Sequence, residues 1–393
     1  MYQDLVDRHR AVFGSAREDV QVVSAPCRIC PIGAHVDHQL GLVTGLALDA
    51  GVHLAYTPNR GGLFRLRSLN FPGQVDFGLA GIPPMVPGDW GNYARGAALA
   101  LRREHEIRNG IDGIITGDLP IGGLSSSAAA GVCYLLALER ANGLELSSAE
   151  NILLDQCIEN QYIGLDNGVL DQSVILLSRK EQLLCLDCKS GEYENVRFAG
   201  EAPPAEIGIV YSGLSRSLVN TEYNRRVAEC KEAARELLRL AGLSAGETAV
   251  LRQVPEEVFE GHLDALPAKL RKRATHYFEE CRRVPRAVDA WRRGDLPEFG
   301  SLMNQSGESS IGNYECGDPH LITLYRLLAG TPGVHGARFS GGGFRGCCVA
   351  LVDANARDEI ASKVFERYPR EHPDTADAFS VHFCGTADGA GWL

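Results

Sequence analysis

The chain has 393 residues, enough for two or three domains of roughly 150 residues each. Its 39 Lys and Arg residues against 50 Asp and Glu residues leave a formal net charge of −11. This acidic balance argues against a nucleic-acid-binding protein, because phosphate contacts need a basic surface, and against attachment to a membrane surface. No apolar run reaches the roughly 18 residues that a membrane span needs.

The first residues (MYQDLVDRHRAVF) carry scattered charges and no apolar segment typical of a secretory signal, so we expect a cytoplasmic protein. In a reducing compartment the 12 cysteines are expected to be buried small side chains or free thiols. Two Cys-x-x-Cys pairs, Cys27–Cys30 and Cys185–Cys188, leave a zinc site or a redox pair open. No Gly or Pro turn separates the cysteines of either pair, which favours packing roles.

Apolar periodicity and turn residues predict the elements of the first half in chain order. They are a helix over 1–14, a strand over 20–24, paired strands over 42–56, a strand over 64–79 interrupted at Pro72-Gly73, a helix over 93–104, a strand over 111–116, an amphipathic helix over 128–141 that ends at Gly143, a helix over 147–164, and strands over 174–177 and 182–187. Residues 189–206, which include Pro203-Pro204, are predicted to form a linker.

The second half is predicted to begin with a strand and then to become mostly helical. The strand covers 207–211, the helical segments cover 227–241, 254–294 and 318–329, and strands return at 337–340, 347–352 and 380–383. Groups of strands and groups of helices in one chain favour an α+β fold.

A glycine- and serine-rich segment over 119–129 (LPIGGLSSSAA) leads directly into a predicted helix. Glycines let backbone N–H groups approach a ligand, and a helix N-terminus adds unpaired donors and the positive end of the dipole. The segment is not a Walker A loop, because no Gly-Lys-Ser or Gly-Lys-Thr occurs in it. It is interpreted either as a phosphate-binding loop or as a capped helix with a flexible lead-in.

Two further clusters carry chemistry. Residues 340–346 (SGGGFRG) match Gly-x-Gly-x-x-Gly, but a strand follows them, so a hairpin is the alternative to a ligand loop and a dinucleotide fold is not favoured. Residues 28–38 (RICPIGAHVDH) hold a cation, a carboxylate and two imidazoles. Metal binding by His35 and His38 would need a third ligand, whereas a loop that binds sugar hydroxyls fits these side chains better.

In this order the three clusters resemble the three motifs of the GHMP kinases, and the first cluster resembles the galactokinase subfamily. Residues 25–38 read APCRICPIGAHVDH where that subfamily reads APGRVNLIGEHTDY. WGNY at 90–93, GVLDQ at 168–172, TEYNRR at 221–226 and the segment 333–352 are similar to further motifs of the subfamily. The resemblance spans nearly the whole chain. It implies a two-domain GHMP kinase fold, with domains at 1–190 and 205–393 and the active site in the cleft between them.

The resemblance also implies roles for individual residues. Asp171 would accept or orient the proton of the sugar's anomeric hydroxyl, and Arg28 would keep Asp171 ionised and stabilise the transferring phosphoryl group. Glu159 and Ser126 would bind the Mg²⁺ that accompanies ATP. The implied sugar-binding residues are Ala34, His35, Asp37, His38, Gly168, Tyr223, Gly342 and Arg345, and the implied ATP-binding residues are Trp90, Gly122, Gly123, Leu124, Ser125, Ser126 and Ser127.

Four departures from the subfamily's pattern stand out. The second motif is one residue shorter, Arg345 replaces a glycine, His38 replaces a tyrosine, and Ala34 replaces the Glu that accepts a hydrogen bond from the sugar's C6 hydroxyl. A Glu would repel a carboxylate at C6, because two like charges about 4 Å apart cost on the order of 4 kcal/mol at an effective dielectric constant of about 20. Ala34 removes that repulsion.

These substitutions resemble those of galacturonokinases, and they predict transfer of phosphate from ATP to the anomeric hydroxyl of D-galacturonate. His38 and Arg345 are the predicted contacts of the C6 carboxylate. A galactokinase of ordinary or broad specificity is the alternative within the same class, and a non-catalytic sensor of sugar and ATP is the alternative from another class. We expect a monomer or homodimer that binds these small molecules only.

Overall fold

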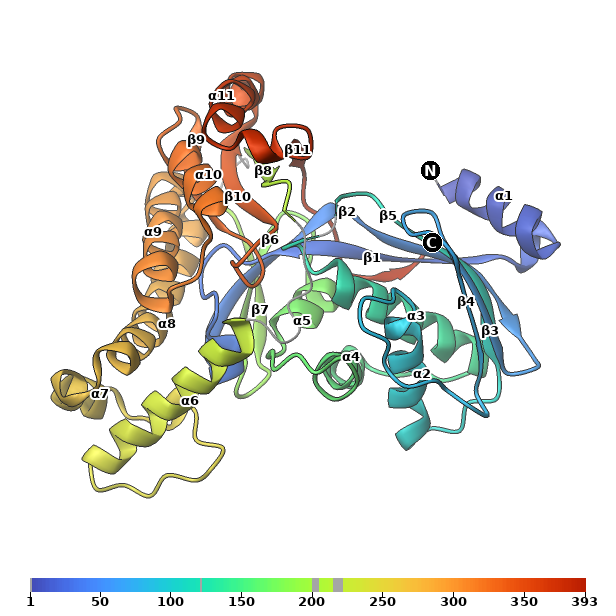
Figure 1. The fold of residues 1–393 in the computed structure, drawn as a ribbon, viewed down its shortest axis with the longest axis horizontal. Helices are drawn as coiled ribbons and strands as arrows, with labels where there is room; N and C mark the ends of the chain where they lie inside the picture. The colour runs from blue at the N-terminus through green and yellow to red at the C-terminus, as the bar shows by residue number, and fades with distance from the viewer. Residues whose placement is uncertain (1, 121, 200–204, 215–221) are drawn as a thin grey trace.

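A computed structural model describes residues 2–120, 122–199, 205–214 and 222–393 (Figure 1). Two sheets organise these residues. The larger sheet has eight strands, in the order β12-β1-β2-β5-β3-β4, with β6 paired to β2 and β7 paired to β6. Its strands are β1 (Gln21–Ile29), β2 (Leu42–Asn59), β3 (Leu63–Ser68), β4 (Gln74–Gly78), β5 (Gly110–Gly117), β6 (Gln182–Asp187), β7 (Tyr193–Arg197) and β12 (Gly391–Trp392).

The smaller sheet has four antiparallel strands in the order β11-β8-β10-β9. They are β8 (Ala205–Tyr211), β9 (Val334–Phe339), β10 (Cys347–Asp353) and β11 (Ser380–Cys384). The α-helices are α1 (Tyr2–Phe13), α2 (Asn92–Glu104), α3 (Ser126–Asn142), α4 (Ser148–Cys157), α5 (Leu170–Leu177), α6 (Glu222–Leu240), α7 (Glu256–His262), α8 (Ala268–Arg293), α9 (Leu296–Ser309), α10 (Pro319–Ala329) and α11 (Arg357–Glu371). Figure 1 shows α2 to α5 beside the larger sheet, and α8 to α11 around the smaller one. The prediction of an α+β fold is confirmed.

The expected pair of strands over 42–56 is one strand, β2, which continues for 18 residues. Its glycines do not mark a turn; they allow close approach of other chain segments. A Cβ at Gly45 would lie 2.1 Å from a methyl carbon of Val174, and one at Gly51 would lie 2.3 Å from the Ala25 carbonyl oxygen. A glycine inside a strand often marks such a close contact.

Several other sequence predictions are corrected. Residues 174–177 belong to helix α5 and not to a strand, because a short apolar run does not distinguish the two. The predicted linker at 189–206 contains β7, which pairs with β6. The helix expected over 147–164 changes at Ile158 from α4 to the π-helical segment η3 (Ile158–Ile163). Helices α9 and α11 had no counterpart in the sequence prediction.

Helix α3 differs in character from the predicted amphipathic helix. It ends before Gly143, as expected, with that glycine in a left-handed conformation. Between Ala128 and Ala141, however, only Ala130 and Arg140 are not buried. The helix lies between the larger sheet and helices α2, α4 and α5, so that it packs on every side. This packing fixes the start of the helix directly after residues 122–125.

The end of the chain returns to the larger sheet. Strand β12 pairs with β1, through Val23 with Trp392 and Ser24 with Gly391, and Thr386 forms a bridge with Leu48. Strands β7 and β12 lie beyond residue 190 and yet belong to the larger sheet, so the sheets do not divide the chain at that residue. The division into domains at 1–190 and 205–393 stays a prediction.

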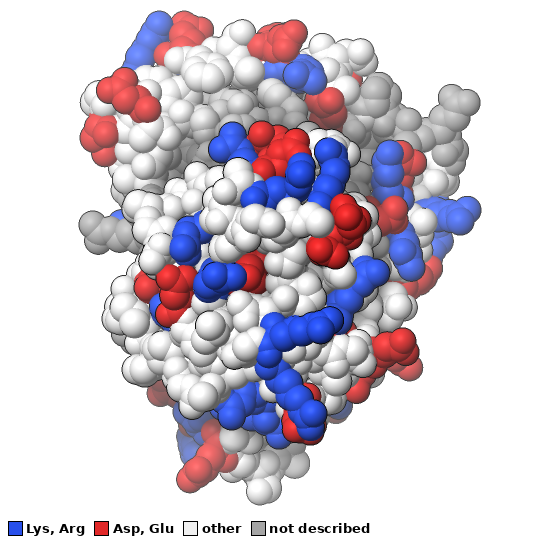
Figure 2. Space-filling view, turned by 90° about the vertical axis from the view of Figure 1, so that its right-hand side faces the viewer, with Lys and Arg blue, Asp and Glu red and all other residues white. Residues whose placement is uncertain are grey.

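The surface seen in Figure 2, which is the right-hand side of Figure 1, carries Lys and Arg interspersed with Asp and Glu. The net negative charge is therefore not separated into one acidic region on this face. Among the described residues, no helix is long and apolar enough to cross a membrane.

Candidate active site

A buried ion pair joins the first motif to the start of helix α5. Arg28 Nε and Nη2 donate to Asp171 Oδ1 at 2.8 and 2.6 Å, and the two side chains are only 4% and 20% exposed. Ser125 Oγ donates to the other carboxylate oxygen, Oδ2. Arg28 also reaches the second motif, because its Nη1 donates to the Gly123 carbonyl at 3.3 Å. A carboxylate at the start of a helix is further stabilised by the helix dipole.

The second and third glycine motifs lie against one another. A Cβ at Gly346 would be 2.8 Å from the carbonyl carbon of Gly122, and one at Gly341 would be 2.8 Å from the Gly123 Cα. Ser340 Oγ closes the contact by donating to the Gly123 carbonyl at 2.6 Å. The predicted hairpin is present, with 340–346 connecting β9 to β10, and its glycines are needed because the two backbones touch.

Two buried carboxylates, Asp155 and Glu159, lie on the helical segments behind the Gly-Ser segment. Burial, and then the charge of Asp171, raises the pKa of Glu159 to about 7, although hydrogen bonds from Asn167 and Ser127 oppose this. Burial raises the pKa of Asp155 well above its usual value, and neither of its carboxylate oxygens has a hydrogen-bond partner in the described chain.

A divalent cation fits this donor set. No ion pair joins Glu159 to a Lys, Arg or His among the described residues, and hard oxygen ligands beside a phosphate-binding loop are what Mg²⁺ prefers. The hydroxyl that hydrogen-bonds with Glu159 belongs to Ser127, the neighbour of the predicted ligand Ser126.

Five of the predicted sugar-binding residues, Ala34, His35, Asp37, Tyr223 and Gly342, line one pocket. It is lined by Arg28, Cys30, Ala34, His35, Asp37, Leu165, Asn167, Leu170, Asp171, Tyr223, Arg338, Phe339, Gly341 and Gly342. Gly168 lies beside it and donates its N–H to Asp37 Oδ2 at 3.1 Å. Burial, and then the charge of Asp171, raises the pKa of Asp37 to about 6. Asp37 therefore faces the pocket as an acceptor that titrates only slightly below neutral pH.

The two histidines of the first motif are buried and tied to Tyr314. His35 stacks on the Tyr314 ring with centroids 4.2 Å apart, and His38 Nε2 lies 3.2 Å from the Tyr314 hydroxyl. His38 Nδ1 lies 2.9 Å from Gln39 Nε2. Burial, and then the charge of Lys231, lowers the pKa of His38 to about 3, so this side chain is neutral at pH 7. Neither histidine belongs to a group of three metal-ligating side chains in the described residues.

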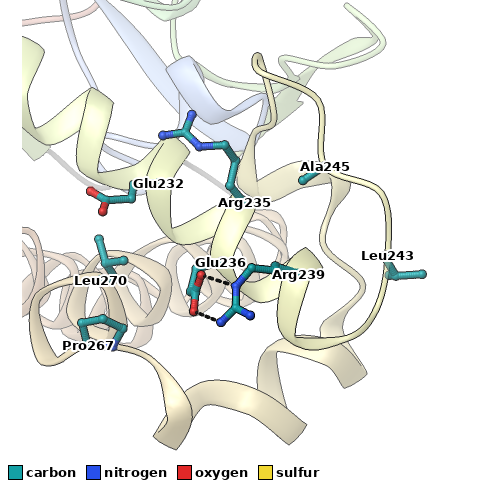
Figure 3. A pocket seen from close by; sticks show the side chains of 8 residues that line it. All are labelled: Glu232, Arg235, Glu236, Arg239, Leu243, Ala245, Pro267 and Leu270. Carbon is teal, nitrogen blue, oxygen red and sulfur yellow. Dashed lines mark hydrogen bonds and ion pairs between the residues drawn. The ribbon is translucent and has the colours of Figure 1, made fainter.

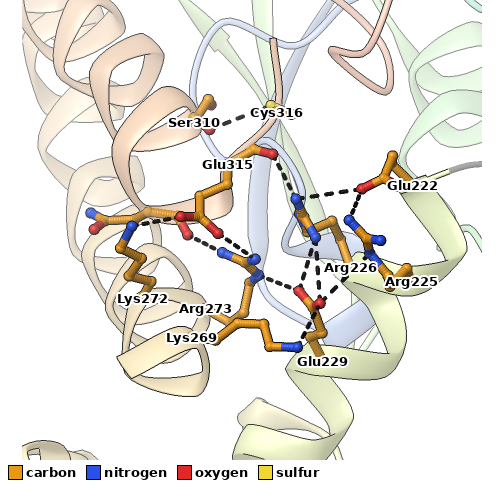
Figure 4. A network of polar contacts seen from close by, with 11 residues as sticks. Glu222, Arg225, Arg226, Glu229, Lys269, Lys272, Arg273, Ser310, Glu315 and Cys316 are labelled. Atoms are coloured by element: carbon orange, nitrogen blue, oxygen red, sulfur yellow. Dashed lines mark hydrogen bonds and ion pairs between the residues drawn. The ribbon is translucent and has the colours of Figure 1, made fainter. Parts of the chain in front are cut away.

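Tyr223 reaches the pocket from helix α6, which a buried ion network fixes in place (Figure 4). Arg273, fully buried, donates to Glu229 on α6 and to Glu315, both at 2.8 Å. Hydrogen bonds from Lys272 and Arg273 lower the pKa of Glu315 to about 2.

The same network continues to another part of the pocket lining, at His35. Glu315 precedes Cys316, whose Sγ lies 3.6 Å from His35 Nε2. The ion pairs therefore link the Tyr223 wall to the His35 wall. Thr221, the first residue of the predicted TEYNRR motif, lies outside the described residues.

Arg338 is a pocket residue that the sequence analysis missed. Its guanidinium is buried and donates to the hydroxyls of Ser306 and Ser310 and to the Phe339 carbonyl. It forms no ion pair with a carboxylate in the described chain. Its position in β9, four residues before the predicted Gly342, was the only signal in the sequence that could have found it.

Predicted ligand residues that do not line this pocket include His38, Arg345 and Trp90. Arg345 does not line it, although the residue belongs to the hairpin loop. Trp90 packs at the edge of the N-terminal core, just before α2. The roles given to these residues in binding carboxylate and adenine stay predictions.

The cysteine pairs do not form a metal site in the described chain. All four of these thiols are free, and Cys27, Cys30 and Cys188 are buried. Burial is the main cause of the raised pKa of Cys27, to about 12, and of Cys30, also to about 12. Thiols held in the neutral form are poor nucleophiles, which fits packing roles.

A second hollow lies between α6 and the start of α8 (Figure 3). Its lining consists of Glu232, Arg235, Glu236, Arg239, Leu243, Ala245, Pro267 and Leu270. Arg239 is engaged by Glu236, at 2.6 and 2.9 Å, and Arg235 donates to the Glu247 carbonyl. None of the predicted site residues lies there.

Comparison with known proteins matches three family descriptions along the chain. Residues 7–58 match the galactokinase galactose-binding signature, residues 92–179 the GHMP kinases N-terminal domain, and residues 287–370 the GHMP kinases C-terminal domain. The chain therefore belongs to the GHMP kinase family. Within that family it carries the signature of the galactokinases.

Similar proteins agree with this assignment over nearly the full length. A galacturonokinase from Arabidopsis thaliana is 45% identical, with 96% of this chain and 94% of that protein aligned. A galactokinase from a Roseiflexus species is 32% identical over 94% of this chain and 92% of its own length.

Solved structures give the same result for the fold. The crystal structure of Lactococcus lactis galactokinase complexed with galactose has a TM-score of 0.90, with 29% identity and 100% of each chain covered. Methanococcus jannaschii mevalonate kinase, at 16% identity, shares the fold with a TM-score of 0.64, covering 93% of this chain and 98% of its own.

Proposed function

We propose that this protein is an ATP-dependent sugar 1-kinase that converts D-galacturonate to α-D-galacturonate 1-phosphate, with release of ADP. The observation that carries the proposal is a buried pocket in which the Arg28–Asp171 pair faces the same space as Ala34. Arg28 and Asp171 supply the phosphoryl-transfer chemistry. Ala34 stands where galactokinases have a Glu, so this position carries no negative charge.

The chemistry follows from the ion pair. Asp171 accepts the proton of the anomeric hydroxyl as the sugar oxygen forms its bond to the γ-phosphorus and the bond from that phosphorus to the ADP oxygen breaks. Arg28 holds Asp171 ionised and stabilises negative charge on the transferring group. Backbone N–H groups of 122–127 would bind the ATP phosphates at the start of α3. Mg²⁺, held by Glu159 with a serine of 126–127, would offset phosphate charge.

Local charge supports a sugar acid as the substrate. Arg338 adds a buried positive charge to the pocket without a carboxylate partner in the described chain, and Ala34 adds no negative one. The nearest acid is the buried Glu280, which is separated from Arg338 by the Ser306 hydroxyl, so a substrate carboxylate would be the direct partner of Arg338. His38, by contrast, is neutral at pH 7 because of its low pKa, so it can contribute a hydrogen bond at most.

A substrate panel tests the proposal. Purified protein with Mg-ATP is assayed for ADP release on D-galacturonate, D-galactose and D-glucuronate, and we expect the highest kcat/KM on galacturonate. Galactose as the best substrate would contradict the proposal and favour a galactokinase. Binding of sugar and ATP without ADP release would favour a non-catalytic sensor.

Asp37→Asn should make the protein more stable at neutral pH and weaken its activity on the sugar. The pKa of Asp37 is raised from 3.8 to about 6 in the folded protein, so ionisation destabilises the fold as pH rises from about 4 to 6. Above pH 6 that cost is constant, at about 3 kcal/mol for a shift of this size. The neutral amide avoids it and can still accept the Gly168 N–H. We therefore expect a higher thermal unfolding midpoint at pH 7.5 and no gain near pH 4.

The same substitution should raise the KM for the sugar, because an amide is a weaker acceptor for a hydroxyl than a carboxylate. Asp166→Asn is the matched control, since this exposed aspartate lies outside the pocket and should change neither quantity. A midpoint for Asp37→Asn below that of the wild type at pH 7.5 would show that Asp37 is not a destabilising buried charge.

A further inference from the structure

Two histidines and an aspartate meet in the C-terminal half of the chain, and none of them lines the sugar pocket. His320 is the second residue of α10, His372 follows the last residue of α11, and Asp374 lies in the short helix η8 (Pro373–Thr375). One ligand atom from each lies within 4.8 Å of the other two. Among the described residues, this is the only such group of His, Cys, Asp or Glu.

The spacing suits a tetrahedral metal ion. His320 Nε2 and Asp374 Oδ2 are 3.1 Å apart. Two ligands on a tetrahedral Zn²⁺ with bonds of about 2.0–2.1 Å are separated by roughly 3.3 Å. The His320 and His372 rings have centroids 4.0 Å apart and an interplanar angle of 31°. An isolated ion pair would account for the contact between His320 and Asp374, but it would not explain why the His372 ring lies against His320.

His372 is held in place before any metal binds. Its Nε2 lies 2.9 Å from Thr323 Oγ1 on α10, and its backbone N–H donates to the Tyr368 carbonyl at 2.9 Å. When Nε2 donates to that hydroxyl, Nδ1 carries the lone pair that a metal ligand needs. Metal-binding histidines are commonly oriented in this way, by a hydrogen bond from the other ring nitrogen.

We propose that His320, His372 and Asp374 form a binding site for Zn²⁺, with the fourth position open to water. Two imidazoles and one carboxylate are ligands that Zn²⁺ accepts readily, whereas Mg²⁺ prefers oxygen ligands alone. The site is therefore distinct in chemistry as well as in place from the Mg²⁺ site proposed at Glu159, and it does not depend on the proposed function.

Zn²⁺ at this position joins two elements that support the third glycine motif. Helix α10 begins just after Gly317, whose N–H donates to the Gly343 carbonyl at 2.7 Å. On the α11 side, the Tyr368 hydroxyl donates to the Ser212 carbonyl at 2.7 Å, and Ser212 Oγ donates to the Gly346 carbonyl at 2.9 Å. Bound Zn²⁺ should therefore raise the thermal stability of the protein.

Calorimetric titration of the metal-free, full-length protein with Zn²⁺ tests the site, with saturating Mg²⁺ present to occupy the Glu159 site. A parallel titration with Co²⁺ reports tetrahedral coordination through its visible spectrum. We expect one site in the wild type, and affinity at least tenfold lower in His320→Ala, His372→Ala and Asp374→Asn. The Zn²⁺-dependent rise in unfolding midpoint should disappear in the same variants.

His382→Ala is the matched control, because this partly buried histidine on β11 contacts Ser380 Oγ and lies outside the cluster. It should bind Zn²⁺ as the wild type does. Asp374 is exposed, so Asp374→Asn should fold even where a histidine variant does not. Absence of Zn²⁺ binding by the wild type, or equal affinity and stoichiometry in Asp374→Asn and His320→Ala, would overturn the proposal. Equal binding in the variants would indicate that Zn²⁺ binds to the partly exposed cysteine thiols instead.

Discussion

Asp171→Asn should lower kcat for sugar phosphorylation by about 10²- to 10⁴-fold, the range typical of a lost general base. The amide keeps the shape of the carboxylate, and its oxygen can still accept from Arg28, but it cannot take the proton of the anomeric hydroxyl. Arg28 also loses its counter-charge in a site where its own side chain is only 4% exposed. Initial rates of ADP release at saturating sugar and ATP provide the measurement.

Asp166→Asn supplies the control for this experiment, since it makes the same chemical change five residues away on an exposed side chain. Calorimetric binding of galacturonate to both variants separates loss of chemistry from loss of the site. Retained binding with lost turnover is the expected result for Asp171→Asn. A kcat within fivefold of the wild type would show that Asp171 is not the proton acceptor.

The motif residues could be predicted from the sequence because each lies in a short segment that resembles a family motif. Arg28, Asp37 and Asp171 were each proposed from short segments, and the structure brings all three to one pocket. Their separation along the chain is long, yet β1, η2 (Asp37–Gln39) and the first turn of α5 hold them together. Similarity to a family, and not periodicity, supplied that long-range information.

Arg338 could not be predicted as a pocket residue for a physical reason. An arginine in a strand is usually expected at the surface, because burial of a charge without a partner is costly. Here two serine hydroxyls on α9 and the adjoining segment, together with the Phe339 carbonyl, compensate for the lost water. Helix α9 was itself absent from the sequence prediction, so the environment that makes a buried Arg338 tolerable was not visible.

The errors in secondary structure have the same origin. Gly45 and Gly51 resemble turn residues when only neighbours in sequence are considered, but they are required by Val174 and Ala25, which approach from other elements. Residues 174–177 have the apolar character of a strand, but they lie in helix α5, from which Val174 packs against Gly45 of β2. In each case a tertiary contact outweighs the local propensity.

The charge of the whole chain and the charge of the site lead to different conclusions. A net charge of −11 affects solubility and long-range steering, and it says little about a buried pocket. Inside the pocket, Arg28 is matched by Asp171, whereas Arg338 forms no direct ion pair in the described chain. The Ser306 hydroxyl separates it from the buried Glu280, which pairs with Arg283. We therefore expect the charge at position 34 to decide whether the pocket favours a neutral sugar or a sugar acid.

Ala34→Glu should lower kcat/KM for galacturonate by about a thousandfold. A glutamate there would place a negative charge about 4 Å from the C6 carboxylate, which costs on the order of 4 kcal/mol at an effective dielectric constant of about 20. At about 1.4 kcal/mol per factor of ten, that equals nearly three orders of magnitude. The effect on galactose should be much smaller, because its C6 hydroxyl can donate to the new carboxylate.

Ala34→Gln separates charge from size in this experiment. Ala34 is only 5% exposed, so any long side chain adds volume to the pocket, and Gln adds nearly the same volume as Glu without its charge. We expect the loss on galacturonate to be far smaller for Ala34→Gln than for Ala34→Glu, with similar kinetics for the two variants on galactose. Equal losses on galacturonate would show that crowding, and not repulsion, is responsible. A loss of activity that is the same for both sugars would show that position 34 does not face C6.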